Sequence, residues 1–269
     1  MTNFETIEIS VEAGVGHLVL AREARLNAMN PQFFDELGVG ISELSAAADV
    51  RVIVLSAKGP HFSVGLDLKE SVIKDTNGSI ASQALTTYNH VRELQRPFNL
   101  LASVPQPTIA VVHGYCIGGG VDLIAACDIR VASADAVFSI RESRIAIVAD
   151  LGSLQRLPRI ISRGHLMELA LTAEDFDAVR AHQINLVNTV YADQVEAMSG
   201  AIKIAGAIAA NSPLSTMGTK NTLNSVYDAE ISRDLDRVAL WNSAFLRSND
   251  LTEAMNAFVE KRDPNFRGN

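Results

Sequence analysis

The sequence predicts an α/β fold in which a strand-rich first part carries a helical carboxy-terminal region. Two short apolar runs, Val52–Ser56 and Thr108–His113, are largely β-branched, which is typical of buried strands. The last third has helical apolar periodicity over Gln194–Ala210 and Leu214–Leu246. Because no linker separates the two parts, we expect residues 1–200 to form a core and residues 201–269 a helical region of the same fold unit.

Local patterns predict the elements of the first hundred residues. The alternating stretch Glu5–Ala21, with Gly14 and Gly16 in its middle, indicates a β-hairpin. Asn30 as N-cap and Pro31 as first helical residue begin a helix that we expect to end near Ala47. The Thr-, Asn-, Gly- and Ser-rich segment 75–83 predicts a mobile loop.

The later elements are predicted in the same way. His90–Ser103 has a helical pattern with a kink expected at Pro97. Ile129–Ala132 and Ala136–Ile140 are predicted strands, and Asn211-Ser212-Pro213 separates the two long helices of the last third.

Composition and charge exclude several classes of function. The net charge of −8 argues against general nucleic-acid binding, which needs cationic side chains. The chain lacks an apolar run of the roughly 18 residues that would span a bilayer, and its acidic start is unlike a secretory signal, so we expect a cytoplasmic protein with no membrane partner. Cys116 and Cys127 form no Cys-x-x-Cys pair and are expected to be small buried residues, and the six histidines show no zinc-protease spacing, so no metal is predicted.

Each of the two predicted buried strands runs into a glycine segment. The first leads to residues 61–70 and the second to residues 114–122, which include Gly118-Gly119-Gly120, and each segment ends where a helix is expected to begin. Such turns can present backbone N–H groups to a developing negative charge, and two of them could share the oxygen of a thioester enolate. A single turn of this kind is also a common packing device, and that alternative stays open for each turn by itself.

Both turns occur in the order and at the separation found in the enoyl-CoA hydratase/isomerase (crotonase) family. Ala24–Met29 resembles the early CoA-contacting segment of that family, Phe62–Leu68 its first oxyanion turn and Gly114–Leu123 its second. Ala257–Pro264 resembles the family ending, so the similarity covers essentially the whole chain. The resemblance implies a crotonase-like spiral of ββα units with a helical carboxy-terminal trimerisation region, and homotrimers that pair into hexamers.

The resemblance also implies residue roles. The oxyanion donors would be the backbone N–H groups of Leu66 and Gly119. CoA is part of the substrate, so no separate cofactor is expected, and its contacts would come from Arg25, Asn27, Ala28, Leu66, Leu68 and Lys69, with Phe258 and Lys261 from a neighbouring subunit.

Three acids indicate the reaction. Hydratases of the family are expected to carry glutamates at the positions of Asp122 and Glu142, where they handle water. Here the first acid is the shorter Asp122, and Asp150 is added where hydratases usually have a small or apolar residue. This combination, together with Trp241-Asn242, resembles the Δ3,5-Δ2,4-dienoyl-CoA isomerases of the family.

The chemistry gives the additional acid a purpose. Moving a 3,5-diene to the 2,4 position removes a proton at C2 and delivers one at C6, which calls for two proton-transfer groups along the acyl chain. We expect Glu142 to be the base at C2 and Asp150 the acid near C6, with Asp122 orienting them. Burial and like charges should raise at least one carboxyl pKa enough to hold a proton near neutrality.

Other interpretations remain open from the sequence. Asp150 could be a helix N-cap, and Glu142 could form a solvated ion pair with Arg141 or Arg144. Asp122 could simply be an acid in the first turn of a helix, where a negative charge is stabilising. At the level of function, the alternatives are a 2-enoyl-CoA hydratase that uses Asp122 and Glu142, and a non-catalytic binding protein of the same fold.

Overall fold

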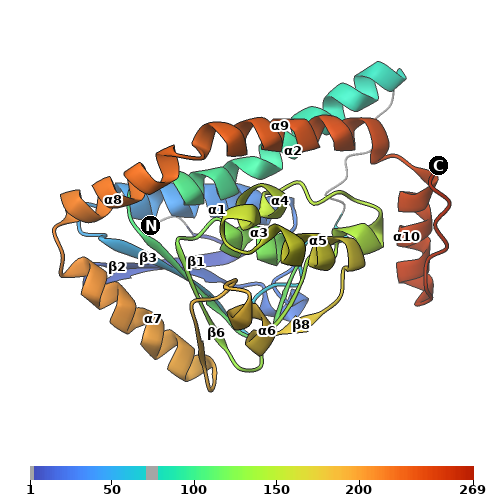
Figure 1. The fold of residues 1–269 in the computed structure, drawn as a ribbon. Helices are drawn as coiled ribbons and strands as arrows, with labels where there is room; N and C mark the ends of the chain where they lie inside the picture. Colours follow the sequence, from blue (N-terminus) through green and yellow to red (C-terminus); the bar gives the residue numbers. More distant parts are fainter. Residues whose placement is uncertain (1–2, 71–77) are drawn as a thin grey trace.

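A six-stranded sheet forms the centre of the computed structural model, which describes residues 3–70 and 78–269 (Figure 1). The strand order is β1-β2-β3-β4-β6-β9; β1 and β2 are antiparallel and every later pair is parallel. The bounds are β1 Ile7–Glu12, β2 Val15–Leu20, β3 Val52–Ala57, β4 Thr108–Val112, β6 Ile129–Ser133 and β9 Thr189–Tyr191.

A smaller sheet and a set of helices complete the fold. The small sheet has the order β5-β7-β8, with bounds β5 Tyr115–Ile117, β7 Val137–Ser139 and β8 Phe176–Asp177. The helices are α1 Pro31–Ala46, α2 Ile80–Ser103, α3 Gly119–Ala125, α4 Ser153–Arg156, α5 Arg163–Thr172, α6 Ala178–Gln183, α7 Gln194–Ala209, α8 Pro213–Ser225, α9 Asp228–Phe245 and α10 Asn249–Glu260. Short 3₁₀ segments occur at η1 Glu23–Arg25, η2 Glu142–Ile145 and η3 Leu157–Arg159. The predicted α/β class and the late helical region are confirmed.

Helices cover both faces of the large sheet, because its central strands are apolar on both sides. Every residue of β3 is buried, as expected for a strand between two layers. Val52 and Val54 point to α7, where Ala197, Ala201 and Ala205 allow close approach. The alternate residues of β3 pack into the larger core on the opposite face, which includes α1.

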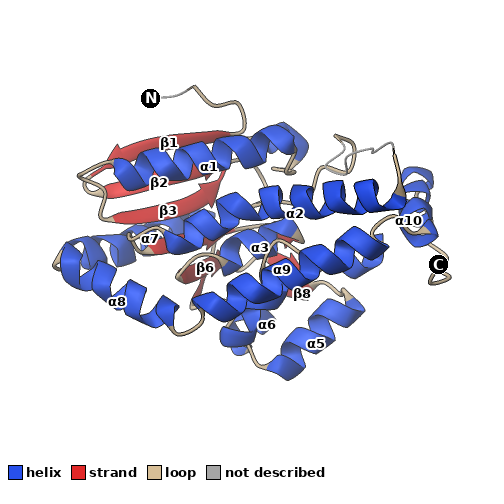
Figure 2. Cartoon of the chain, turned by 90° about the horizontal axis from the view of Figure 1, so that it is seen from above, coloured by secondary structure: helices blue, strands red, loops and turns tan. Residues whose placement is uncertain are grey.

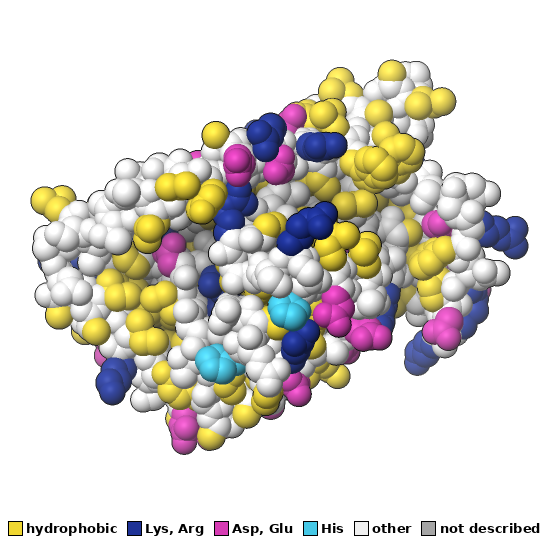
Figure 3. All heavy atoms as spheres, in the orientation of Figure 1, with side chains coloured by type: hydrophobic (Ala, Val, Ile, Leu, Met, Phe, Trp, Pro, Cys, Tyr) yellow, Lys and Arg dark blue, Asp and Glu magenta, His cyan; other side chains and the backbone are white. Residues whose placement is uncertain are grey.

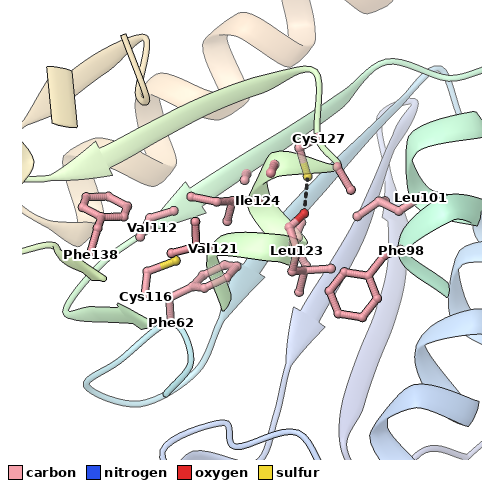
Figure 4. Close-up of a cluster of buried hydrophobic side chains, with 14 of the residues drawn as sticks. Phe62, Phe98, Leu101, Val112, Cys116, Val121, Leu123, Ile124, Cys127 and Phe138 are labelled. Carbon is pink, nitrogen blue, oxygen red and sulfur yellow. Dashed lines mark hydrogen bonds between the residues drawn. The ribbon is translucent and has the colours of Figure 1, made fainter. Parts of the chain in front are cut away.

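The larger core surrounds the second glycine turn and α3. Figure 4 shows the rings of Phe62, Phe98 and Phe138 around the α3 residues Val121, Leu123 and Ile124. Cys116 and Cys127 lie in the same cluster as buried free thiols, which confirms the expectation for both. The element that carries Asp122 is therefore held by packing on several sides.

The carboxy-terminal helices are docked on the core by buried polar contacts as well as by packing. α2 and α9 lie side by side in both ribbon views (Figures 1 and 2). On α8, the buried ammonium of Lys220 donates to the carbonyl of Gln106 at 3.0 Å and lies 2.8 Å from Oδ2 of Asp128. The helical region and the sheet are thereby joined close to the end of α2.

Several predicted boundaries need correction. α2 begins at Ile80, because the Ser79 side chain accepts a hydrogen bond from the N–H of Ser82, so residues 80–83 are helical and not loop; residues 75–77 lie outside the described part. The helix runs on through Pro97. The long helix predicted over 214–246 is interrupted at Val226 and Tyr227, which separate α8 from α9.

A smaller correction concerns the hairpin turn. The hairpin turn is Ala13-Gly14, both with positive φ, whereas Gly16 lies within β2. The helix expected where the first glycine segment ends, after Glu70, falls on residues that lie outside the described part; within the segment, Leu66 forms an isolated bridge with Met29. Helix α7, which spans residue 200, packs on the large sheet.

The α1 interface allows a test of the core. Leu37→Ala removes a fully buried side chain and should lower the free energy of unfolding by about 2–5 kcal/mol, because the cavity left behind closes only in part. Val39→Ala on the exposed side of the same helix is the matched control and should change it by less than about 0.5 kcal/mol. Urea unfolding of both variants measures this, and equal losses would show that the buried face of α1 does not contribute as described.

Candidate active site

The two glycine turns lie against each other. The N–H of Ser63 in the first turn donates to the carbonyl of Tyr115 at 2.9 Å, and the N–H of Ile117 in the second donates to the carbonyl of Ser63 at 3.0 Å. A methyl group built on Gly65 would lie 3.3 Å from the amide nitrogen of Gly119. The structure therefore brings together two segments separated by some fifty residues of sequence.

Each turn presents a free backbone N–H. The residues on either side of Leu66 are fixed by Met29, whose N–H donates to Gly65 and whose carbonyl accepts from Asp67, while the Leu66 N–H has no acceptor among residues 3–70 and 78–269. Gly119 is the first residue of α3, where an N–H has no partner within the helix. Two such donors side by side can bind one oxygen that gains negative charge.

Glu142 lies next to the second turn. Its side chain is 9% exposed, and a methyl group on Gly118 would lie 3.2 Å from its Oε1. Its Oε2 is buried and has no hydrogen-bond partner in the part of the chain that the structure describes. Glu142 is buried and forms no ion pair with Arg141 or Arg144 among the described residues, and Arg141 pairs with Asp175, so the interpretation of Glu142 as half of a solvated ion pair is wrong. A buried carboxyl oxygen without a partner is available for proton transfer.

Asp122 connects two helices beneath this turn. It lies in the first turn of α3, is 1% exposed, and its Oδ1 accepts a hydrogen bond of 2.5 Å from the N–H of Ser153, the first residue of α4. The Arg156 guanidinium on α4 adds a positive charge nearby that favours the ionised form of Asp122. Asp122 is thus held by backbone and charge, in agreement with an orienting position.

Asp150 points into an apolar cavity. α4 begins at Ser153 after Gly152, so Asp150 is not an N-cap, and its Oδ2 accepts a hydrogen bond of 2.6 Å from Nδ2 of Asn242 on α9. The cavity extends between α2, the loop before α4 and the end of α9. Its lining residues are Leu66, Thr86, Thr87, His90, Val91, Leu94, Ile147, Asp150, Leu151 and Leu246.

Burial changes the acidity of all three carboxyls. Burial, opposed by the hydrogen bond from Asn242 and assisted by the charge of Asp122, raises the pKa of Asp150 to about 7. Burial, followed by the charge of Asp122, raises the pKa of Glu142 well above its usual range. The pKa of Asp122 is raised by burial and held down by the Ser153 N–H and Arg156. The group therefore retains protons near neutral pH, as expected from the sequence.

The expected CoA-contacting residues differ in what they offer. Arg25 and Lys69 are exposed near the first turn, and Leu68 is partly exposed. The Asn27 side chain is committed to the fold, since Nδ2 donates to the carbonyls of Lys58 and His61 and Oδ1 accepts from the N–H of Arg22. Ala28 is buried behind it, so these two residues can reach a ligand only through the backbone.

Phe258 and Lys261 lie at the far end of α10. The helix begins beside the segment that follows η2, where its Leu251 packs with Ile147 and Leu246. Phe258 is 52% exposed and Lys261 ends the helix in the left-handed conformation. Both side chains are therefore accessible on the surface of this chain.

The sequence did not identify the residues that support Asp150. Gln95 on α2 and Asn242 on α9 both contact it, yet neither belonged to the expected site residues. Asn242 was visible only through its family pattern, and Gln95 through a polar residue on the otherwise apolar face of a predicted helix. Their contacts span 55 and 92 residues of sequence, which local patterns do not encode.

Residues 10–269 match the family model described as enoyl-CoA hydratase/isomerase. The chain belongs to the enoyl-CoA hydratase/isomerase family. It is 43% identical to the mitochondrial Δ(3,5)-Δ(2,4)-dienoyl-CoA isomerase of Dictyostelium discoideum, over 95% of this chain and 88% of that protein. It is 42% identical to the peroxisomal Δ(3,5)-Δ(2,4)-dienoyl-CoA isomerase of Arabidopsis thaliana, over 99% of this chain and 98% of that protein.

A solved structure is also similar to this chain. Methylmalonyl-CoA decarboxylase in complex with 2-nitronate-propionyl-CoA superposes with a TM-score of 0.84 at 26% identity, covering 99% of this chain and 100% of that one. The crotonase-like fold expected from the two turns and the family ending is therefore confirmed.

The raised pKa of Asp150 has a consequence for stability. In the unfolded chain this carboxyl releases its proton near pH 3.8, whereas in the folded protein its pKa is about 7, so the folded state loses stability as pH rises between these values. Asp150→Asn removes this cost and should gain up to about 4 kcal/mol at pH 8, with a smaller gain at pH 5. Urea unfolding at both pH values measures it, with exposed Asp49→Asn as control; a gain independent of pH would contradict the burial of this acid.

Proposed function

We propose that this protein is an isomerase that converts a 3,5-dienoyl-CoA into the 2,4-dienoyl-CoA. The observation that carries the proposal is the position of Asp150, which lines the same apolar cavity as Leu66, one of the two residues with a free N–H at the paired turns. The relatives named dienoyl-CoA isomerase, at 42–43% identity over nearly the whole chain, support the same activity.

The reaction is a balanced transfer of two protons. The thioester oxygen would lie between the N–H groups of Leu66 and Gly119. Glu142 takes a proton from C2, and the electrons move toward the carbonyl, whose oxygen is stabilised by both donors. Asp150 then gives a proton to C6 as the double bonds move from positions 3 and 5 to positions 2 and 4. CoA stays attached, and no separate cofactor is required.

The surroundings of the two acids support the assignment of Glu142 to C2 and Asp150 to C6. Glu142 lies against Gly118, directly before the Gly119 donor, so it is close to where a carbonyl and its C2 would be held. Asp150 lies among the aliphatic side chains of Val91, Leu94 and Leu151, which suit an acyl chain beyond C2. Asp122 has one oxygen committed to the Ser153 N–H, and its charge raises the pKa of Glu142.

The two alternatives are less well supported. A hydratase would use Asp122 and Glu142 together on a water molecule, but Asp122 is engaged at Oδ1 and buried behind the turn. A binding protein without activity would not need two buried acids and a third, half-buried one, because burying a carboxylate is costly. The face in Figure 3 carries Lys and Arg interspersed with Asp and Glu, with no continuous basic area for a nucleic acid.

Substrate contacts, assembly and location extend the proposal. Arg25, the backbone at Asn27 and Ala28, Leu68 and Lys69 would hold CoA, with Phe258 and Lys261 supplied by a neighbouring subunit of a homotrimer or of a hexamer of paired trimers. The exposed Trp241 and Phe245, whose rings lie 4.6 Å apart on α9, support an assembly that covers them.

The relatives are named as mitochondrial and peroxisomal, and a cytoplasmic location stays a prediction. Among the described helices, none is long and apolar enough to cross a bilayer.

The direct test follows the ultraviolet absorbance of the conjugated product formed from 3,5-octadienoyl-CoA. Asp150→Asn should lower kcat by about 100- to 10,000-fold because it cannot deliver the proton to C6, and Glu142→Gln should do the same at C2. Asp49→Asn is the matched surface control. If Asp150→Asn isomerises at the wild-type rate, or if the unchanged protein only hydrates a 2-enoyl-CoA, the proposal fails.

The paired turns supply a second test. Gly65 has a φ of 84°, and a methyl group on it would lie 2.9 Å from the carbonyl oxygen of Ile117, so Gly65→Ala should push the turns apart. Loss of a well-placed donor should lower kcat by about 100- to 1,000-fold in the same assay. Gly164→Ala, where a methyl group meets no atom within 4 Å, is the control. Similar rates for the two variants would show that catalysis does not depend on the close approach of the turns.

A further inference from the structure

We propose that Asn242 is a positioning residue for Asp150, and that α9 thereby forms part of the active site. The inference rests on the proposed isomerase function and deepens it, because it assigns to the helical carboxy-terminal region a role in the proton transfer at C6. Asn242 does not line the cavity, so it acts through Asp150 and not on the substrate.

The carboxamide of Asn242 holds both the side chain and the backbone around Asp150. Its Nδ2 donates to Oδ2 of Asp150 at 2.6 Å and to the carbonyl of Val148 at 2.9 Å. Both N–H bonds of the amide are used, and the residue is 2% exposed. The carboxyl group is therefore fixed relative to the loop that carries it.

A second buried amide fixes the same loop from α2. Nε2 of Gln95 donates to the carbonyl of Asp150 at 2.7 Å and to the carbonyl of Leu235 at 3.1 Å, and Gln95 is fully buried. Leu235 lies two turns before Asn242 on α9. Helix α2, helix α9 and Asp150 thus form one hydrogen-bonded unit, in which Gln95 sets the backbone and Asn242 sets the carboxyl.

The pattern of α9 indicates that this asparagine is not needed for packing. The buried face of the helix consists of Leu235, Val238, Ala239 and Asn242, spaced as an apolar stripe. A leucine at 242 would continue this stripe without burying a polar group, which is costly unless its hydrogen bonds are made. The amide contributes a neutral donor aimed at an acid, and it exchanges no proton of its own.

Other titratable or charged groups near Asp150 remain in place when Asn242 is changed. They are Asp122 on α3, Glu142 at η2, His90 on α2, which lines the same cavity, and Arg92, which reaches Gln95 and donates from Nη1 to its Oε1. Since Asn242 favours the ionised form of Asp150, its loss should raise the pKa of that carboxyl. Because these groups are unchanged in Asn242→Leu, an upward shift of the Asp150 pKa in that variant is attributed to the lost hydrogen bond.

The test uses Asn242→Leu and the isosteric Asn242→Asp in the full-length protein. Both should lower kcat for 3,5-octadienoyl-CoA by about 10- to 100-fold with little change in KM, because the acid is misplaced while substrate contacts persist. The alkaline limb of the pH–rate profile should move upward by about one pH unit, since Asp150 keeps its proton to higher pH. Infrared titration of the Asp150 carboxyl, identified by subtracting the Asp150→Asn spectrum, should show the same shift.

The matched control is Asn224→Leu on α8. Nδ2 of Asn224 donates to the carbonyl of Ala102 at 3.2 Å, so it also ties the carboxy-terminal region to α2, but it does not contact Asp150. A kcat loss shared with this control, or an alkaline limb and carboxyl titration that both Asn242 variants leave unmoved, would overturn the proposal. Absence of isomerisation by the unchanged protein would refute the function instead, and the infrared titration would still decide the role of Asn242.

Discussion

The hydrogen-bonded pairing of the two glycine turns is the constraint on which the rest of the site depends. Ser63 exchanges backbone hydrogen bonds with Tyr115 and Ile117, as two strands would, and this pairing brings the segment that carries the free N–H of Leu66 close to Gly119. Side chains would prevent the approach. A methyl group on Gly114 would lie 2.1 Å from the carbonyl oxygen of Pro60, and one on Gly65 would meet Ile117. The glycines are required because backbone, and not side chain, lies against them.

Three carboxyls then share a volume that disfavours charge. Their burial raises the pKa of each, and the protein opposes this with few groups: the Ser153 N–H and Arg156 at Asp122, and Asn242 at Asp150. Glu142 has no such support at Oε2. The three side chains are all carboxyls, but they differ in the hydrogen bonds and charges around them. The supported acids have defined orientations, whereas Glu142, whose Oε1 lies next to Gly118, keeps an unpartnered Oε2 that is free to bind a substrate proton.

The sequence predicted the turns and the acids but not the contacts between distant segments. Buried strands such as Val52–Ala57 and capped helices such as Pro31–Ala46 carry their signals locally, and they were found within a residue or two. The start of α2 at Ile80 was missed, because polar residues near the beginning of an exposed helix resemble a loop. Family resemblance indicated Asp150, whereas its apolar cavity is assembled from α2, the loop before α4 and the end of α9.

The carboxy-terminal helices cannot be regarded as an assembly device alone. Gln95 joins the backbone of Asp150 to α9 near Leu235, and Asn242 reaches the carboxyl from two turns further along the same helix. Leu246, just after α9, closes the cavity, and it packs with Leu251 of α10. A displacement of α9 would therefore move the acid, open the acyl cavity and remove a hydrogen bond at the same time. Docking of this region on the core and placement of the second proton-transfer group consequently depend on the same contacts.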